Sequence, residues 1–413
     1  MRASGGLTMH TVCAAISGIL LSRQEGRMKR CTVLFGAFLI LTTTASAQIG
    51  KSVSVAAGTP EDKDLESIYA APDGPDKIAL LDKFMADHGT GDLALLGDQL
   101  YAQTYLAQKN YAKVYEYGDK VLALDPDNFS ALILMMHAAE EQGDAQRIYA
   151  LGEKVGPLLA RYQASPAPAG LSEDQWSAQK AQNLKDAQAD LNYVQYAMVN
   201  AAYKTKDLPP RIQLLERYAK AFPDSQYTLA VREQTAIAYQ QTQNTPKMIE
   251  TAQSILTKDP DNISMLLLLA DNWSENGQQL DKAGADAKKA LELLGKAQKP
   301  DNVPDDQWQK QVSIQKGLAY SALGQVYVNN NQNAQAVDAF KQASPLLKSD
   351  AFSYGRNLYR LGFTLAKMQR TPEARTVLTE AVSVNSPYKA KAQETLNKIG
   401  GATAKKSAHK AAS

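Results

Sequence analysis

The chain has 413 residues, and its 45 Lys+Arg against 43 Asp+Glu give a formal net charge of +2. This near balance argues against nucleic acid as the main partner, because phosphate-binding surfaces normally show a concentrated basic excess. Two cysteines and four histidines argue against a cysteine-based metal site or a thiol redox enzyme. No apolar run reaches the roughly 18 residues that are needed to span a bilayer, so an integral membrane protein is not expected.

The first element in chain order is a predicted secretory signal at residues 28–47. Met28 is followed by two basic residues, an apolar stretch over residues 31–41 and a small-residue end at Ala47, which are the three parts of such a signal. We expect translation to begin at Met28 and cleavage to follow Ala47, so that residues 1–47 hold an N-terminal extension plus the signal peptide. A buried N-terminal helix is the alternative, but no helical period continues past the apolar stretch. The signal predicts a periplasmic or secreted protein with no membrane span after cleavage.

Cleavage after Ala47 would remove five basic residues, one acidic residue and both cysteines, Cys13 and Cys31. The net charge would fall from +2 to −2. An exported chain without cysteine has no disulfide and must be stabilised by packing alone. Residues 48–59 are expected to form a linker between the signal and the first helix.

Residues 60–192 and 193–325 are predicted to be two copies of a tandem unit of about 133 residues. Three pairs of segments match in the same order at an offset of 134 or 132 residues: Lys77–Phe84 with Arg211–Tyr218, Asp125–Asn128 with Asp259–Asn262, and Ser172–Trp176 with Pro304–Trp308. Residues 326–398 then hold the terminal repeats.

Apolar residues follow a helical period throughout residues 60–398, and strand-like alternation is absent. A shorter period of roughly 34 residues is visible inside the units. Its clearest copies place small residues at matching positions: Gly324, Ala336 and Ala343, then Gly362, Ala374 and Ala381. Weaker copies place other residues at these positions: Ala102, Val114 and Val121; Ala236, Met248 and Ile255; Ala270, Ala283 and Ala290.

These spacings resemble the tetratricopeptide repeat, in which small residues let two antiparallel helices approach closely. The resemblance covers residues 60–398 and implies an all-α fold, a right-handed α-α superhelix with a concave and a convex face. A final helix over residues 387–398, stopping at Gly400, is expected to cap the open end. Residues 399–413 are expected to be a disordered basic tail.

Two irregular linkers precede the segments that carry Trp176 and Trp308. The helices that follow, over about 172–204 and 304–329, are expected to be longer than an ordinary repeat helix. The two tryptophans could be ligand platforms. Packing is the favoured interpretation, because large apolar residues at matched positions of duplicated helices usually pack.

No catalytic constellation is visible. The histidines that remain after cleavage, His88, His137 and His409, lie in separate segments without cysteines or paired carboxylates at ligand spacing. Asp125-x-Asp127 begins like a calcium loop but lacks the further ligands and the glycine. No glycine-rich phosphate loop and no Gly-x-Ser-x-Gly elbow occurs. The sequence therefore predicts a protein that is not an enzyme and has neither a metal site nor a cofactor.

The resemblance implies that a partner peptide lies in the concave groove, against the first helix of each pair. The family's groove positions fall on polar and tyrosine residues here, which suit the hydrogen bonding and contact area of a peptide. The candidate peptide-binding residues are Gln99, Gln103, Tyr193, Tyr196, Asn200, Glu233, Gln240, Asp271, Gln325 and Asn329, with His137, Tyr203 and Tyr359 at further groove positions. Gln99 and Gln103 stand where some members carry the Lys/Asn clamp for a C-terminal carboxylate. For each residue, an ordinary solvated helix face is the alternative.

Residues 211–240, with Leu214, Tyr218 and Phe222, look like the repeats of periplasmic proteins that assemble the outer membrane or coordinate cell-wall synthesis. We therefore expect a non-enzymatic interaction scaffold or adaptor of the bacterial cell envelope, with a protein or peptide partner in its concave groove and no nucleic acid. The alternative is a structural component of outer-membrane or cell-wall biogenesis. Such a component would dock into an envelope complex through its convex face or its long helices.

Overall fold

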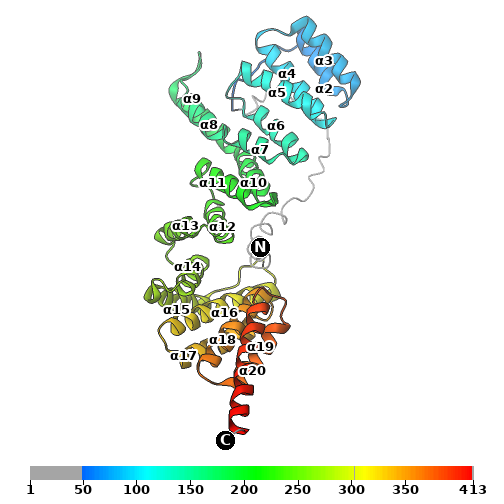
Figure 1. The fold of residues 1–413 in the computed structure, drawn as a ribbon. Coiled ribbons are helices and arrows are strands. Elements are labelled where there is room, and N and C mark those ends of the chain that lie inside the picture. The colour runs from blue at the N-terminus through cyan, green and yellow to red at the C-terminus, as the bar shows by residue number, and fades with distance from the viewer. Residues whose placement is uncertain (1–48, 302, 412–413) are drawn as a thin grey trace. The chain divides into compact units, whose positions relative to one another are not determined.

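The computed structural model describes residues 49–301 and 303–411, so the expected signal peptide at Met28–Ala47 lies outside the described residues. The described chain is helical, without any strand (Figure 1). It divides into two compact blocks. We call them the N-terminal block, up to Ala238, and the C-terminal block, from Tyr239 onward. Within the described residues, no helix combines the length and the apolar character that a membrane crossing requires.

The N-terminal block contains α2 (Pro60–Ala70), α3 (Pro75–His88), α4 (Gly91–Ala107), α5 (Tyr111–Leu124), α6 (Phe129–Gln142), α7 (Ala145–Gly152), α8 (Val155–Ala164), α9 (Glu173–Asp186), α10 (Gln188–Lys204), α11 (Leu208–Ala221) and most of α12 (Thr228–Gln241). The C-terminal block contains α13 (Thr245–Lys258), α14 (Ile263–Glu275), α15 (Leu280–Lys296), α16 (Asp305–Asn329), α17 (Asn333–Leu347), α18 (Ala351–Lys367), α19 (Thr371–Ser383) and α20 (Lys389–Ala411).

Helices that follow one another pack as pairs, and the first helix of a pair also contacts the first helix of the next pair. The pairs α4–α5, α14–α15, α16–α17 and α18–α19 pack together, while α4 contacts α6, and α16 contacts both α14 and α18. This is the contact pattern of a stack of helix pairs. The predicted all-α solenoid of helix pairs is confirmed, whereas the duplication of a 133-residue unit stays a prediction. In each block we call the surface formed by the first helices the first-helix face.

The residues at the predicted close-packing positions share almost complete burial. Those with side chains and at most 2% exposure are Ala102, Val114, Val121, Ala236, Met248, Ile255, Ala270, Ala283, Ala290, Ala336, Ala343, Ala374 and Ala381. At the two glycines a side chain would collide with the paired helix: a Cβ on Gly324 would lie 2.5 Å from the Phe340 ring, and one on Gly362 would lie 2.6 Å from Leu378. The small residues therefore set the distance between the paired helices.

The two Asp-Pro-Asp-Asn turns, at residues 125–128 and 259–262, each begin the next helix with an asparagine cap. Asn128 caps α6 by accepting from the Ala131 N–H, and Asn262 caps α14 by accepting from the Met265 N–H. Each asparagine also donates to an aspartate three residues earlier, at 3.1 Å in the first turn and 3.0 Å in the second. Capping of this kind satisfies backbone donors that the helix leaves unpaired.

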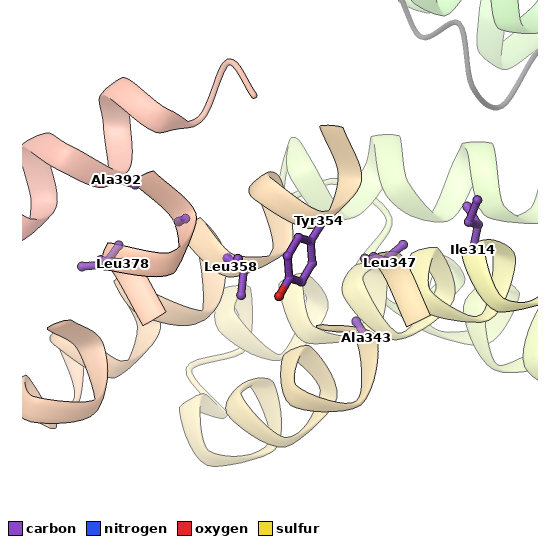
Figure 2. Close-up of a cluster of buried hydrophobic side chains, with 8 residues drawn as sticks. Ile314, Ala343, Leu347, Tyr354, Leu358, Leu378 and Ala392 are labelled. Carbon is purple, nitrogen blue, oxygen red and sulfur yellow. The ribbon is translucent and has the colours of Figure 1, made fainter. Parts of the chain in front are cut away.

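The last helix covers a hydrophobic cluster at the end of the C-terminal block. Tyr354 and Leu358 of α18 pack with Leu347 of α17, Leu378 of α19 and Ala392 of α20 (Figure 2). Partly buried Leu396 and Ile399 of α20 extend this cluster. The capping helix is thus observed where the sequence predicts it.

The final helix does not stop at Gly400 as expected. Instead α20 runs from Lys389 to Ala411, so the prediction of a disordered tail over residues 399–413 is wrong for residues 399–411. Gly400 and Gly401 each lower the stability of a helix by roughly 1 kcal/mol relative to alanine. The Ala- and Lys-rich sequence that follows has a high helix propensity, which offsets that cost.

Two other expectations are modified. The predicted helix over about 172–204 is divided at Ala187 into α9 and α10, whereas α16 forms a single helix of 25 residues. The predicted linker over 48–59 is anchored at its start, because Ile49 is buried and accepts from the Phe129 N–H at 3.2 Å. The Lys51 N–H also donates to Asp125 at 2.8 Å.

We predict that Gly362→Ala lowers the free energy of unfolding by about 1–3 kcal/mol, because the new methyl group must displace Leu378 from a packed interface. Urea unfolding followed by circular dichroism measures the change. Gly295→Ala in α15 is the matched control, since no atom lies within 4 Å of its Cβ position. Its stability should be unchanged or slightly higher, and equal destabilisation by both variants would contradict the close-packing role of Gly362.

Candidate functional site

The C-terminal block brings together three candidate groove residues on the first-helix face. Asn329 of α16 donates from Nδ2 to the Ser274 carbonyl of α14 at 2.6 Å. Gln325 lies one turn earlier on α16 and donates to the Asn329 side-chain oxygen at 3.4 Å. Asp271 lies one turn before the end of α14. These polar side chains therefore line neighbouring first helices.

Asp271 forms ion pairs between α14 and α18, two first helices that are separated by the first helix α16. Its carboxylate lies 2.9 Å from Arg356 and 3.8 Å from Arg360, both on α18. Arg360 also pairs with Glu275 at the end of α14 and donates to Ser321 Oγ of α16 at 3.2 Å. We call Asp271, Glu275, Arg356 and Arg360 the arginine cluster. The arginine cluster joins α14 to α18 across α16. Ser321 of α16 is small and buried, which leaves room for the Arg360 side chain.

Asp271, Arg356 and Arg360 of the arginine cluster are largely buried, so their charges depend strongly on one another. Burial opposes the charge of Asp271, but the two guanidinium groups outweigh that effect and lower the pKa of its carboxyl. Burial also disfavours the charged form of Arg356, yet Asp271 outweighs it and raises the pKa of this guanidinium. For Arg360, burial and the neighbouring Arg356 lower the pKa. Arginine nevertheless stays protonated in proteins, so the cluster holds two full positive charges.

An aromatic strip lies beside the arginine cluster. Tyr359 of α18 has its ring centroid 6.1 Å from that of Phe363 and 5.9 Å from that of Tyr388. Phe363 is 47% exposed. On an α-helix Arg356, Tyr359, Arg360 and Phe363 share one face. This face of α18 therefore combines two buried, paired arginines with an exposed aromatic ring.

The N-terminal block contains a second group of candidate residues. The His137 ring of α6 stacks on Tyr193 of α10 with a centroid distance of 4.3 Å. The Tyr193 hydroxyl donates to Glu140 at 2.9 Å, and burial together with this carboxylate raises the pKa of the Tyr193 hydroxyl. Two predicted groove residues, His137 and Tyr193, are thus in direct contact.

A cavity of about 190 Å³ lies next to this stack. Glu140 of α6 and Asn200 and Lys204 of α10 supply its polar groups, and Ile148 and Ala197 supply apolar lining. A carboxylate, an amide and an ammonium can hydrogen-bond both donors and acceptors. The pocket can therefore receive a small group that carries polar atoms.

The remaining candidates are distributed along the first helices. Gln99 on α4 is partly buried and Gln103 is exposed, whereas Tyr196, Tyr203, Glu233 and Gln240 on α10 and α12 are all partly buried. Among the described residues, only some of the predicted positions belong to the two groups above. The structure does not gather all of them into one site.

Arg356, Arg360, Glu275 and Phe363 are missing from the sequence-based set. A signal for them exists, because α18 carries two arginines spaced by four residues. An acidic pair with the same spacing, Asp271 and Glu275, occupies α14. The sequence does not reveal that these two pairs meet.

The structure supports a packing role for Trp176. Its side chain is buried, stacks edge-on against Tyr162 at a centroid distance of 5.7 Å, and donates to the Ser165 carbonyl at 3.0 Å. Trp308 near the start of α16 is partly exposed. The two tryptophans, although matched in sequence, therefore differ in environment.

A group of potential metal ligands was missed by the sequence analysis. Asp64 of α2 lies near Asp87 and His88 of α3, with possible ligand atoms within 4.8 Å of one another. Lys83 lies 3.1 Å from Asp64 and 3.6 Å from Asp87, so an ammonium already supplies positive charge there. The hydrogen bond from Lys83 lowers the pKa of Asp64. These contacts form a surface ion-pair cluster and disfavour a bound cation.

A larger cavity of about 550 Å³ lies among α13, α14 and α15. Within the described chain its lining is made of Ile249, Gln253, Trp273, Gln278, Gln279 and Lys282. Trp273 is only 5% exposed, so little of its ring can contact a ligand. This cavity shares no residue with the arginine cluster.

Comparison with known proteins identifies one repeat by sequence. The tetratricopeptide repeat model matches residues 318–344, which include Gly324, Ala336 and Phe340. No curated protein sequence matches the chain. The tetratricopeptide repeat is therefore supported directly at the junction of α16 and α17, and the other copies stay predictions.

Several solved structures are similar at low identity. The anaphase-promoting-complex hetero-tetramer Cut9–Hcn1 is 16% identical with a TM-score of 0.41, and the match covers 83% of this chain and 64% of that chain, less than two-thirds of its length. The P58(IPK) tetratricopeptide repeat domain is 13% identical with a TM-score of 0.31, covering 84% and 99%. NprR in complex with its cognate peptide NprX is 13% identical with a TM-score of 0.37, covering 82% and 81%.

We predict that Asp271→Asn lowers the free energy of unfolding by about 3–5 kcal/mol, because it leaves buried arginine charge without its anionic partner. Chemical unfolding at pH 7 measures this loss. The control is Lys296→Gln, which breaks the exposed pair with Glu292 and should change stability little.

The loss caused by Asp271→Asn should also depend on pH. Because the folded pKa of Asp271 lies below its ordinary value of 3.8, its stabilisation is complete above that pH and disappears as pH falls through the folded pKa. The gap between the wild type and Asp271→Asn should therefore be constant near neutrality and shrink in acid. A gap that stays constant throughout the acid range would contradict the ion-pair assignment.

Proposed function

We propose that the protein is a non-enzymatic interaction scaffold or adaptor that binds peptide segments of a partner protein on its concave, first-helix face. The observation that carries this proposal is the polar pocket beside the His137–Tyr193 stack, where Asn200 and Lys204 line the cavity. Exposed amides and partly buried tyrosines on the same helices add hydrogen-bonding groups and contact area. Peptide recognition commonly uses this combination.

The size of the pocket supports a peptide over a larger organic ligand. Its volume of about 190 Å³ is below the roughly 300–1,000 Å³ that is usual for drug-sized ligands. A pocket of this size suits one side chain of a peptide whose remaining residues lie along the helices. The specificity of such binding would come from the polar groups of Glu140, Asn200 and Lys204.

The pairing of ionisable groups supports a role other than catalysis. Glu140 accepts from Tyr193, and Asp271 is paired with Arg356 and Arg360. A general acid or base must reach a substrate proton. Carboxylates that are already engaged by neighbouring side chains fit structural and binding roles better.

The second candidate is a structural role in outer-membrane or cell-wall biogenesis, with docking through the long helices. The first turns of α16 are exposed, and Trp308 stands there partly uncovered. Partly exposed aromatic residues are enriched at protein interfaces. Both candidates place the protein in a bacterial cell envelope, as the predicted signal peptide suggests.

We predict that Tyr196→Ala combined with Asn200→Ala weakens peptide binding at least tenfold without loss of helicity, since both residues lie on the first-helix face of α10. Fluorescence anisotropy with labelled mixed-sequence peptides measures affinity, and circular dichroism reports helicity. Thr257→Ala, at an exposed position of α13, is the control and should bind normally. Loss of partner capture by Trp308→Ala, with normal binding by the α10 variant, would instead favour docking through α16.

We predict that the mature protein begins at residue 48 after export. N-terminal sequencing of protein recovered from the periplasm or the medium tests this expectation. A start at Met1 or Met28 would overturn export. Ile49 is buried, so the mature terminus would lie one residue before an anchored position.

A further inference from the structure

We propose that the second Asp-Pro-Asp-Asn turn, at residues 259–262, binds an extended segment of a partner protein with the pattern apolar-Gly-x-x-apolar. The first turn, at residues 125–128, already holds such a segment of this chain, residues 49–53, which we call the N-terminal strap. The second turn joins α13 to α14 and contains none of the candidate groove residues. The inference therefore does not depend on the proposed function.

Hydrogen bonds hold the N-terminal strap against the first turn. The Lys51 N–H donates to the Asp125 carboxylate at 2.8 Å, and the Ile49 carbonyl accepts from the Phe129 N–H at 3.2 Å. The Lys51 ammonium donates to the Leu124 carbonyl at 2.9 Å. Two of these three bonds use only the main chain of the strap, so they select an extended backbone and leave the choice of sequence to the side chains.

Three strap positions restrict that sequence. Ile49 is 2% exposed, so its place requires an apolar residue. Gly50 has a φ of +117°, and a Cβ on it would lie 2.5 Å from the Asp125 carboxylate, so its place requires glycine. Val53 packs with Leu122 against a buried apolar cluster. The turn thus accepts the pattern apolar-Gly-x-x-apolar.

The second turn has the same backbone geometry as the first. The φ and ψ angles are −142° and 89° at Asp125 and −129° and 81° at Asp259. They are −72° and 94° at Asn128 and −66° and 97° at Asn262. The hydrogen bond from the asparagine to the aspartate is also kept, at 3.1 Å and 3.0 Å. The second turn therefore holds its carboxylate as the first turn does.

The groups that bind the strap in the first turn are uncovered in the second. Among the described residues, the Asp259 carboxylate accepts only from Asn262. Ile263 begins α14, so its N–H has no partner within the helix. Asp259 and Ile263 are partly exposed, whereas their counterparts Asp125 and Phe129 are each 3% exposed. An acceptor, a donor and apolar surface are thus available to a ligand.

The free site favours a segment of another protein. The chain's own strap is already bound at the first turn, and a second copy would have to release its strap from that complete site before binding here. A partner segment without a competing site of its own has no such cost. Leu256, which matches Leu122 in the sequence, packs with Ile263 beside the second turn, and both are only partly buried. These two residues offer apolar contact to the ligand.

The test uses the full chain as recovered from its expression host and a fluorescent peptide with the strap sequence, Ile-Gly-Lys-Ser-Val-Ser-Val-Ala, blocked at both ends. A second peptide carries Gly50→Val. Anisotropy titrations measure the affinity of each peptide. We expect the glycine peptide to bind at least tenfold more tightly, because a side chain at this position collides with the aspartate at the first turn.

Variants of the second turn locate the binding. Asp259→Ala should weaken binding about tenfold or more, as expected for the loss of a hydrogen bond to a charged group. Ile263→Pro removes the N–H at a helix position that suits proline and should also weaken binding, whereas Ile263→Val keeps the N–H and should bind normally. Asp261→Ala is the control within the turn, because it breaks only an exposed pair with Lys289 and should leave the affinity unchanged.

Three results would overturn the inference. The first is failure of the glycine peptide to bind, and the second is binding that Asp259→Ala and Ile263→Pro leave unchanged while Asp125→Ala abolishes it, which would mean exchange with the strap at the first turn. The third is a dimer in sedimentation that Ile263→Pro dissociates, which would make a second copy the occupant. The two Ile263 variants decide the question even if Asp259→Ala does not fold. The α10 variant tests the proposed function separately.

Discussion

The close approach of paired helices is the constraint on which the rest of this structure depends. Gly324 against Phe340 and Gly362 against Leu378 leave no room for a Cβ, and the alanines at matching positions are fully buried. The distance between paired helices fixes which side of each first helix faces the neighbouring pairs. It thereby places polar residues such as Asn200 and Asn329 beside residues of a neighbouring helix pair rather than on isolated helices.

Most of the fold could be predicted from sequence because its determinants are local and repeated. Asn128 and Asn262 cap their helices through bonds that span three residues, and Ser172 with Gln175 forms a capping box. Such short-range signals recur along the chain, so the register is visible even where a single copy is weak. The tail escaped prediction because Gly400 usually ends a helix but here lies within α20.

The candidate site was predicted only in part, because its key contacts are not local. His137 and Tyr193 were recognised as groove positions, yet the cavity beside them depends on how α6 and α10 pack. Asp271 was expected to face a ligand, but its partner Arg356 lies 85 residues away on a helix that is not its neighbour in the stack. No spacing rule within one repeat contains that information.

The arginine cluster has a consequence for how the C-terminal block unfolds. In a simple repeat array each repeat interacts only with its neighbours, so stability behaves as a one-dimensional sum and the ends can fray independently. The pair between Asp271 and Arg356 joins α14 to α18 and passes over α16, which adds a next-nearest-neighbour coupling. The helix pairs between them should therefore melt as one cooperative unit, and the central pair could not be deleted or duplicated without separating the two charges.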